Sequence, residues 1–447
     1  MVQLTNTQND LIQQKIKELV ELKLQTKKKE WVPGVDWVQY AGSLFDENEF
    51  IAGIETFLDG WLALGENGIR FENKFSPKLG KEFGALTNSG SSANLLMVSS
   101  LSSKKLFNLP KGSKIITPVA GFPTTINPIL QNGYEPVFID IELDTLNLNI
   151  EQLEAAAKAG ASALIFAHVL ANPPNMDDVM AIVNKYGLIL LEDCCDALGS
   201  YYDGKRLGSF GELASCSFYP AHHMTMGEGG FVACRTKEQE VVIKSLREWG
   251  RGCYCSGKAS NCLKNGMCKK RFSNWLPLLP DEVMDHKYVY EEIGYNLKPL
   301  DMQASIGLVQ LNKLDELIEK RKYNFSRLIK IFEPYSDIFY LPKATEKADP
   351  AWFAFPLTLK NTAKFTRTQF TMFMEDHKIQ TRNYFGGNIL LQPAYKHLIK
   401  TNPITTYPNA TTATKQTFFL GTSPVITDQH LDYIQQIVDI FLLNSER

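Results

Sequence analysis

EPVFIDIELDTLNLNIEQLEAAAKAGASALIFAHV, residues 135–169, places one helical pattern between two short apolar runs. The runs are EPVFIDI and ALIFAHV, and EQLEAAAKA lies between them. KIITP at 114–118 and LILLED at 188–193, with a helical pattern over 176–185, extend the same alternation. Apolar strands that alternate with helices are typical of βαβ units. The sequence therefore predicts an α/β fold with a mostly parallel sheet that helices cover on both faces.

The segments on either side of this region predict an arm and a second domain. Ile12, Ile16, Leu19 and Val20 recur at helical spacing and indicate an amphipathic helix laid on a larger body. Apolar positions between 311 and 328 indicate a long helix that connects the two domains. We expect a helical arm over 1–44, a large α/β domain over 45–310, and the connecting helix with a smaller α+β domain over 311–447.

Composition excludes several classes of protein. The 447 residues are 44% hydrophobic, and 47 Lys+Arg against 49 Asp+Glu give a net charge of −2, so no global basic field would attract nucleic acid or an anionic membrane. The sequence has no apolar run long enough for a membrane span and no signal-peptide core, so a cytoplasmic protein is expected. Eight cysteines are too few for a disulfide scaffold, but four of them cluster, which indicates metal or redox chemistry.

Three polar segments carry candidate chemistry. TNSGSSANLL at 87–96 offers backbone amides and hydroxyls at a helix start, which suits a phosphate or simply caps a helix. Asp193 closes the LILLED strand, where a carboxylate either caps a helix or faces a ligand. SFYPAHHMTMGEGG at 217–230 contains two adjacent histidines, which could be metal ligands, a base or polar loop residues. Each segment alone leaves its structural and its functional interpretation open.

Together, in this order and spacing, the segments resemble the DegT/DnrJ/EryC1/StrS sugar aminotransferase family of fold-type I pyridoxal-phosphate enzymes, over about residues 45–440. The resemblance implies the fold-type I architecture. It also implies that Asn296, in EEIGYNLKPLDMQA, reaches the cofactor phosphate of a neighbouring subunit, so that the protein works as a homodimer. The residues that match the family's other cofactor ligands are Gly90, Ser91, Ser92 and Ser217 for the phosphate, Phe122 for stacking on the ring, and Asp193 for the ring nitrogen.

The sequence departs from the aminotransferase pattern at the residue that binds the cofactor covalently. The family motif S-F-H-x-x-K ends in a lysine that forms a Schiff base, whereas His222 stands at that position here. Tyr219 replaces the motif's histidine, and Asp196 replaces the histidine of E-D-x-x-H. The cofactor would therefore be held non-covalently, as pyridoxamine phosphate, with His222 as a general base whose pKa lies near the working range.

These replacements resemble the dehydratase branch, and most closely its iron-sulfur 3-dehydrases that act on CDP-4-keto-6-deoxyglucose. That resemblance implies a 2Fe-2S cluster held by Cys195, then a C-x-C pair after 57 intervening residues, which is Cys253 and Cys255 here, then one further cysteine. We favour Cys268 as this fourth ligand because KKRF follows it, and Cys262 is the alternative. The resemblance thus implies an iron-sulfur loop over 250–272 within a cofactor-binding large domain. A Cys₄ zinc site is a competing interpretation of the thiols.

The resemblance implies that the protein removes the C3 hydroxyl of a nucleotide-linked 4-keto-6-deoxyhexose, in the 3,6-dideoxysugar biosynthesis that serves surface polysaccharides such as lipopolysaccharide O-antigen. A separate flavin and iron-sulfur reductase would supply electrons from NADH or NADPH. The basic residues Lys264, Lys269, Lys270 and Arg271 are candidates for docking an acidic face of that reductase, or they are simply solvated. Arg382 either faces the substrate diphosphate or forms an interdomain salt bridge.

Two other functions stay open. The first is a cluster-free dehydratase of the same branch that regenerates its cofactor with glutamate and needs no reductase. The second is a non-catalytic scaffold or regulatory protein with this fold. The complete set of cofactor ligands argues against the second, because a scaffold has no need of them.

Overall fold

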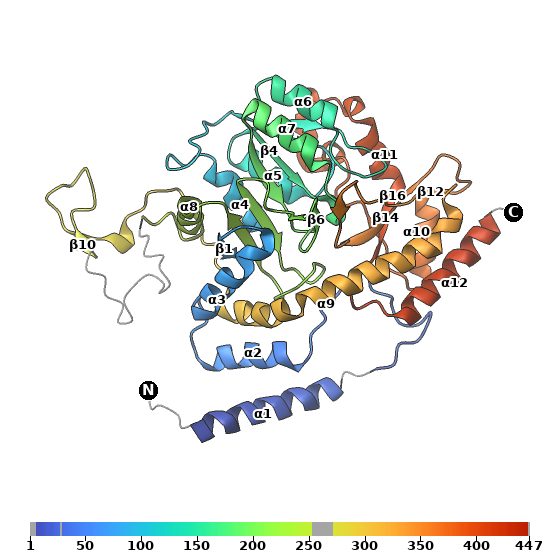
Figure 1. Cartoon of the computed structure of the whole chain (residues 1–447), viewed down its shortest axis with the longest axis horizontal. Coiled ribbons are helices and arrows are strands. Elements are labelled where there is room, and N and C mark those ends of the chain that lie inside the picture. The colour runs from blue at the N-terminus through green and yellow to red at the C-terminus, as the bar shows by residue number, and fades with distance from the viewer. Residues whose placement is uncertain (1–5, 27–28, 253–270, 446–447) are drawn as a thin grey trace.

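A seven-stranded sheet lies at the centre of the computed structural model, which describes residues 6–26, 29–252 and 271–445 (Figure 1). The strand order is β1-β9-β8-β5-β4-β2-β3, and within this sheet only β9 runs against the others. The strands are β1 (Phe83–Thr87), β2 (Lys114–Pro118), β3 (Glu135–Ile139), β4 (Ala163–Ala167), β5 (Ile189–Asp193), β8 (Leu213–Ser217) and β9 (Gly230–Cys234). The strands predicted over 114–193 and the mostly parallel sheet are confirmed.

Helices cover both faces of this sheet, as the βαβ pattern predicts. Alternate strand residues pack on each side, so that Ile165 belongs to one hydrophobic core and its neighbours Leu164 and Phe166 belong to the other. The helices of the first face are α4 (Gly90–Ser100), α5 (Pro123–Gln131) and α8 (Lys237–Arg247). Those of the second face are α3 (Glu66–Phe75), α6 (Ile150–Lys158), α7 (Met176–Tyr186) and part of α9.

Helix α9 (Asp301–Phe332) joins this α/β layer to a second hydrophobic core (Figure 1). Its Leu311 and Leu314 pack against the central sheet, whereas its Leu328 and Phe332 pack in the second core. That core lies against a four-stranded sheet of order β12-β14-β16-β15. Its elements are β12 (Phe339–Tyr340), β14 (Ala354–Leu359), α10 (Arg367–Asp376), β15 (Arg382–Asn383), α11 (Pro408–Gln416), β16 (Thr417–Gly421) and α12 (Asp428–Ser445).

The N-terminal arm is helical, as predicted, but only part of its apolar face is covered. In α1 (Asn6–Gln25) the side chains of Ile16 and Val20 are buried, and α1 contacts α2 (Glu47–Leu58). Ile12 and Leu19, which share the predicted apolar face, are exposed. The body of this one chain therefore covers two of the four apolar positions from which the arm was predicted.

A hairpin of β10 (Phe272–Ser273) and β11 (Met284–Asp285) projects from the large sheet, at the left of Figure 1. It carries large exposed apolar side chains, among them Leu278 and, beyond β11, Ile293, which are 93% and 96% exposed. A small sheet of β13 (Ala348–Asp349), β6 (Tyr201–Tyr202) and β7 (Lys205–Arg206) completes the strands. Among the described helices, none has the length and apolar character of a membrane span.

Candidate active site

A cavity of about 690 Å³ lies at the carboxyl ends of β4, β5 and β8, where ligands bind in open α/β sheets. The beginning of α4 forms one wall, and the edge of the four-stranded sheet forms another. Of the residues predicted from the sequence, the cavity is lined by Gly90, Ser91, Phe122, Asp193, Cys195, Ser217 and His222. Segments more than a hundred residues apart in the chain thus meet at one site.

The first turn of α4 forms a cradle against β8. Ser89 caps the helix, because its hydroxyl accepts a hydrogen bond from the Ser92 amide at 3.1 Å. Gly90 packs so closely on Ser217 that a Cβ at Gly90 would lie 2.5 Å from Ser217 Cβ. The free amides of a helix start next to hydroxyls suit a phosphate group. Ser92 is buried behind this surface and does not line the cavity, and its hydroxyl lies 3.0 Å from Ser89 Oγ.

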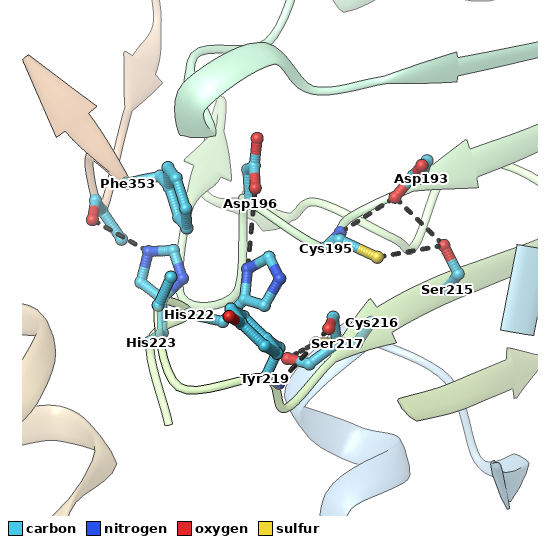
Figure 2. Close-up of polar contacts among 12 residues, drawn as sticks. Asp193, Cys195, Asp196, Ser215, Cys216, Ser217, Tyr219, His222, His223 and Phe353 are labelled. Atoms are coloured by element: carbon cyan, nitrogen blue, oxygen red, sulfur yellow. Dashed lines mark hydrogen bonds and ion pairs between the residues drawn. The ribbon is translucent and has the colours of Figure 1, made fainter. Parts of the chain in front are cut away.

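Asp193 faces the cavity from the last position of β5, and four donors orient its carboxylate. Asn94 Nδ2 and Thr125 Oγ1 donate to Oδ2, both at 2.7 Å. The Cys195 amide and Ser215 Oγ donate to Oδ1 at 3.1 and 3.2 Å (Figure 2). Such a fixed anion at the cavity floor suits the protonated nitrogen of a pyridine ring.

The preceding residue, Glu192, points to the opposite side of the strand and is fully buried. Its carboxylate lies 2.9 Å from His168 Nε2 and accepts hydrogen bonds from the amides of Gly208 and Gly211. The two adjacent acids therefore differ in role, because successive side chains of a strand alternate between faces. Glu192 anchors the fold, and Asp193 serves the cavity.

His222 lies in an irregular loop after β8, and its Nδ1 is 3.6 Å from Asp196 Oδ1 (Figure 2). Burial and the Arg321 guanidinium lower the pKa of His222 to about 4. Burial and the Asp193 charge raise the pKa of Asp196 to about 8. The sequence suggested a histidine pKa near neutrality; the structure differs because the imidazole has little access to water and lies near a buried cation.

Aromatic side chains shape the remaining walls. Phe122, at the start of α5, is half exposed into the cavity and makes an edge contact with Phe385. Tyr219 lines the cavity beside His222, and the Phe353 ring centroid lies 5.2 Å from that of His222. His223 points away, with its Nε2 3.0 Å from the Ala351 carbonyl oxygen, which fits its interpretation as a structural residue (Figure 2).

Cys195 is the one predicted cluster ligand within the described residues. Its Sγ lies in the cavity wall, 3.9 Å from Ser215 Oγ and next to Gly90. Burial and the neighbouring acids raise the pKa of its thiol. Cys194, Cys216 and Cys234 are buried small residues, as predicted. The predicted ligands Cys253, Cys255 and Cys268, with the alternative Cys262, lie outside the described residues.

Three other predicted residues have different environments. Asn296 is exposed and does not line this cavity, a position that is compatible with a role at a neighbouring subunit. Arg382 does line it: its guanidinium stacks 4.2 Å over the Tyr40 ring, and within the described residues no carboxylate pairs with it. Arg271 is engaged by Asp285 in two hydrogen bonds, which reduces its availability for docking, and Lys264, Lys269 and Lys270 lie outside the described residues.

Several residues of the site were not predicted. Asn94 and Thr125 hold Asp193, and Arg321 lies behind His222. Asn94 had a detectable signal, since it lies in the TNSGSSANLL segment, four residues after Gly90. Thr125 and Arg321 are ordinary polar positions in the sequence, and only the folded chain brings them to the site.

Comparisons with known proteins agree with this geometry. The profile of the DegT/DnrJ/EryC1/StrS aminotransferase family matches residues 45–439. The lipopolysaccharide biosynthesis protein RfbH of Salmonella typhimurium is 43% identical, over 93% of this chain and 94% of its own. A dTDP-4-dehydro-2,6-dideoxy-D-glucose 3-dehydratase of Saccharopolyspora spinosa is 41% identical, over 93% of this chain and 88% of its own.

Solved structures confirm the predicted fold. An Escherichia coli GDP-4-keto-6-deoxy-D-mannose-3-dehydratase with bound hydrated PLP superposes with a TM-score of 0.78 at 26% identity, over 90% of this chain and 99% of that one. On the match over residues 45–439 and these identities, the chain belongs to the DegT/DnrJ/EryC1/StrS aminotransferase family.

Proposed function

We propose that the protein is a pyridoxamine-phosphate-dependent 3-dehydrase of a nucleotide-linked 4-keto-6-deoxyhexose, with CDP-4-keto-6-deoxy-D-glucose as the favoured substrate. The observation that carries this proposal is His222, an imidazole in the cavity wall at the position of the family's Schiff-base lysine. Asp196 and Tyr219, which also depart from the aminotransferase pattern, lie beside it. The three replacements thus form one cluster around the position where the covalent bond would otherwise form.

The residues present fit the cofactor. The cradle between Gly90 and Ser217 has no room for a Cβ, and it presents helix-start amides as a phosphate requires. Phe122 offers a ring for stacking, and Asp193 is a buried anion held by four donors. When bound, pyridoxamine phosphate supplies an amine that reacts with the C4 ketone and a ring that accepts electrons.

In this proposal His222 moves one proton, Asp193 pairs with the charged ring nitrogen, and Arg382 pairs with the substrate diphosphate. His222 removes a proton from the cofactor carbon C4′, and Asp193 keeps the ring nitrogen protonated. Asp196 Oδ1 lies 3.6 Å from Nδ1 and would orient the imidazole on approaching to hydrogen-bond distance. The C3–O bond of the sugar would break, and the proton taken by His222 would pass to the departing hydroxyl, which leaves as water. Arg382, which no described carboxylate neutralises, supplies a cation at the cavity wall for the substrate diphosphate.

Return of the cofactor to its starting form requires two electrons. In this proposal they would come from NADH or NADPH, passed singly by a flavin and iron-sulfur reductase to a 2Fe-2S cluster that Cys195, Cys253, Cys255 and Cys268 would hold. The place of Cys195 in the cavity wall supports this, since a cluster there adjoins the cofactor site. Cys262 is the alternative fourth ligand.

A homodimer is part of the same proposal. The β10–β11 hairpin and the segment after it expose apolar side chains that the described part of the chain leaves uncovered, including Leu278 and Ile293. Asn296 follows three residues after Ile293 and is exposed as well. A second copy that covers this segment would bring Asn296 to its own cofactor phosphate. Light scattering of the purified protein measures the mass: about twice 50.4 kDa supports the dimer, and a monomer contradicts it.

The first experiment measures iron and acid-labile sulfide per chain in anaerobically purified protein, with absorption and electron paramagnetic resonance spectra. About two irons and two sulfides per chain, with a signal on reduction, support the reductase-coupled 3-dehydrase. No iron after reconstitution favours the cluster-free, glutamate-driven dehydratase, and zinc makes the thiols structural. A titration with pyridoxamine phosphate tests the scaffold alternative, because a scaffold does not bind it.

A further inference from the structure

Arg321 is a fully buried arginine on α9 whose guanidinium reaches the loop of His222. It is 1% exposed. Its Nη2 donates to the carbonyl oxygens of Ala221 and His222 at 2.8 and 2.7 Å. Its Nη1 donates to the Phe353 carbonyl oxygen at 3.0 Å. One side chain thus connects two segments that lie more than a hundred residues apart.

Both segments contact the imidazole. Ala221 and His222 belong to an irregular loop, where no helix or strand ladder fixes the backbone. Phe353 directly precedes β14, and its ring packs 5.2 Å from the His222 ring. Arg321 therefore fixes the backbone that carries the imidazole and also the backbone that carries its aromatic neighbour.

Burial of the Arg321 guanidinium costs desolvation free energy, which indicates that the residue has a specific role. Within the described residues no carboxylate bonds the guanidinium, and a buried cation surrounded by carbonyl groups is expensive to desolvate. A planar guanidinium directs its donors from two separate nitrogens in a rigid fork, whereas the three donors of an ammonium diverge from a single nitrogen. Arg247, which is also buried, differs in that two carboxylates, those of Glu72 and Glu248, pair with its guanidinium.

We propose that Arg321 is the positioning residue of the active-site loop: it ties the Ala221 and His222 carbonyls to that of Phe353, and so sets where the His222 imidazole stands in the cavity. This inference rests on the proposed function for its kinetic consequence. Arg321 does not line the cavity, so it acts through the loop and not on the substrate.

The test compares Arg321→Met, Arg321→Lys and a control on the same helix, Leu328→Ala. Leu328 is fully buried in the second core, so its truncation lowers the melting temperature without touching the loop. Two measurements are made on each variant. One is kinetic: the single-turnover rate of elimination is measured at saturating substrate, after a titration has given the dissociation constant of pyridoxamine phosphate. The other is amide hydrogen exchange of the peptide over 218–226, measured without cofactor.

We expect Arg321→Met to slow elimination about 10- to 100-fold, as for a base displaced by roughly 1 Å, with cofactor affinity unchanged. Exchange in 218–226 should accelerate. Arg321→Lys should recover part of the rate because its ammonium keeps some of the hydrogen bonds. Leu328→Ala should keep the wild-type rate, and its exchange should accelerate in the second core instead.

Wild-type elimination and wild-type loop exchange in Arg321→Met would overturn the inference, as would an equal slowing in Leu328→Ala. If Arg321→Met does not fold, Arg321→Lys decides: a slower rate with unchanged cofactor affinity supports the inference, and the wild-type rate overturns it. If the wild-type enzyme itself does not eliminate, the proposed function fails, and loop exchange alone then decides whether Arg321 holds the loop.

Discussion

Gly90→Ala should weaken binding of pyridoxamine phosphate while leaving the fold intact. The new Cβ would lie 2.5 Å from Ser217 Cβ and 2.9 Å from Cys195 Sγ. Carbon atoms prefer about 3.5–4.0 Å, so the cradle must open by roughly 1 Å. Overpacking of this kind costs about 1–3 kcal/mol. If the loss falls on the phosphate cradle, affinity drops about 5- to 150-fold, since each 1.4 kcal/mol is about tenfold.

The assay is a fluorescence titration with pyridoxamine phosphate, together with a melting curve. Alanine is a better helix former than glycine by about 0.5–1 kcal/mol, which offsets part of the clash in global stability. Gly53→Ala on α2 is the matched control, because its Cβ would meet Ile306 at an ordinary 3.5 Å. Wild-type affinity in Gly90→Ala would refute the assignment of this cradle to the phosphate.

Three further expectations follow from the same site and its supports. His222→Asn should bind pyridoxamine phosphate with wild-type affinity but lose elimination by about 10² or more in single-turnover kinetics; normal turnover would show that another group is the base. Borohydride treatment with pyridoxal phosphate should leave no pyridoxyl-lysine in the cavity by mass spectrometry, and a modified lysine there would favour an aminotransferase. Burial by itself would raise the pKa of Glu72, but Lys244 and Arg247 outweigh burial and hold this pKa below its usual range. The stabilisation from these two ion pairs is complete above about pH 4.3, and it is lost as the pH falls through the lowered pKa. Glu72→Gln should therefore melt below wild type at pH 7, and calorimetry should show this gap closing on acidification; a gap independent of pH would contradict the ion-pair account.

The sheet was predictable because its strands are short, apolar and separated by helices. The expected strand at 114–118 matches β2, and the helix expected over 176–185 differs from α7 by one residue. The arm was less predictable. Helical spacing gives the face of a helix but not how much of that face the rest of the chain covers, and Ile12 and Leu19 are exposed for that reason.

The candidate site likewise contains residues that the sequence predicted and residues that it did not. Motifs that are contiguous in sequence identified Gly90, Asp193 and His222, and the fold brings them to one cavity. The groups that hold those residues come from distant segments: Thr125 precedes Asp193 by 68 residues, and Arg321 follows His222 by 99. A pKa cannot be predicted from a motif either, because the shift at His222 depends on burial and on a cation from another helix.

The neighbouring acids at the end of β5 have a consequence for how mutations in this family are interpreted. Glu192 braces the loop that contains Gly208 and Gly211, whereas Asp193 faces the cavity one residue later. A screen of whole cells would record the same loss of activity for a change at either acid. A Glu192 variant would lose it through misfolding, whereas an Asp193 variant would fold but be inactive. A one-residue deletion earlier in β5 would shift both acids by one residue and so turn each to the other face of the strand, which would remove both properties at once. Abundance and activity therefore have to be scored separately at these two codons.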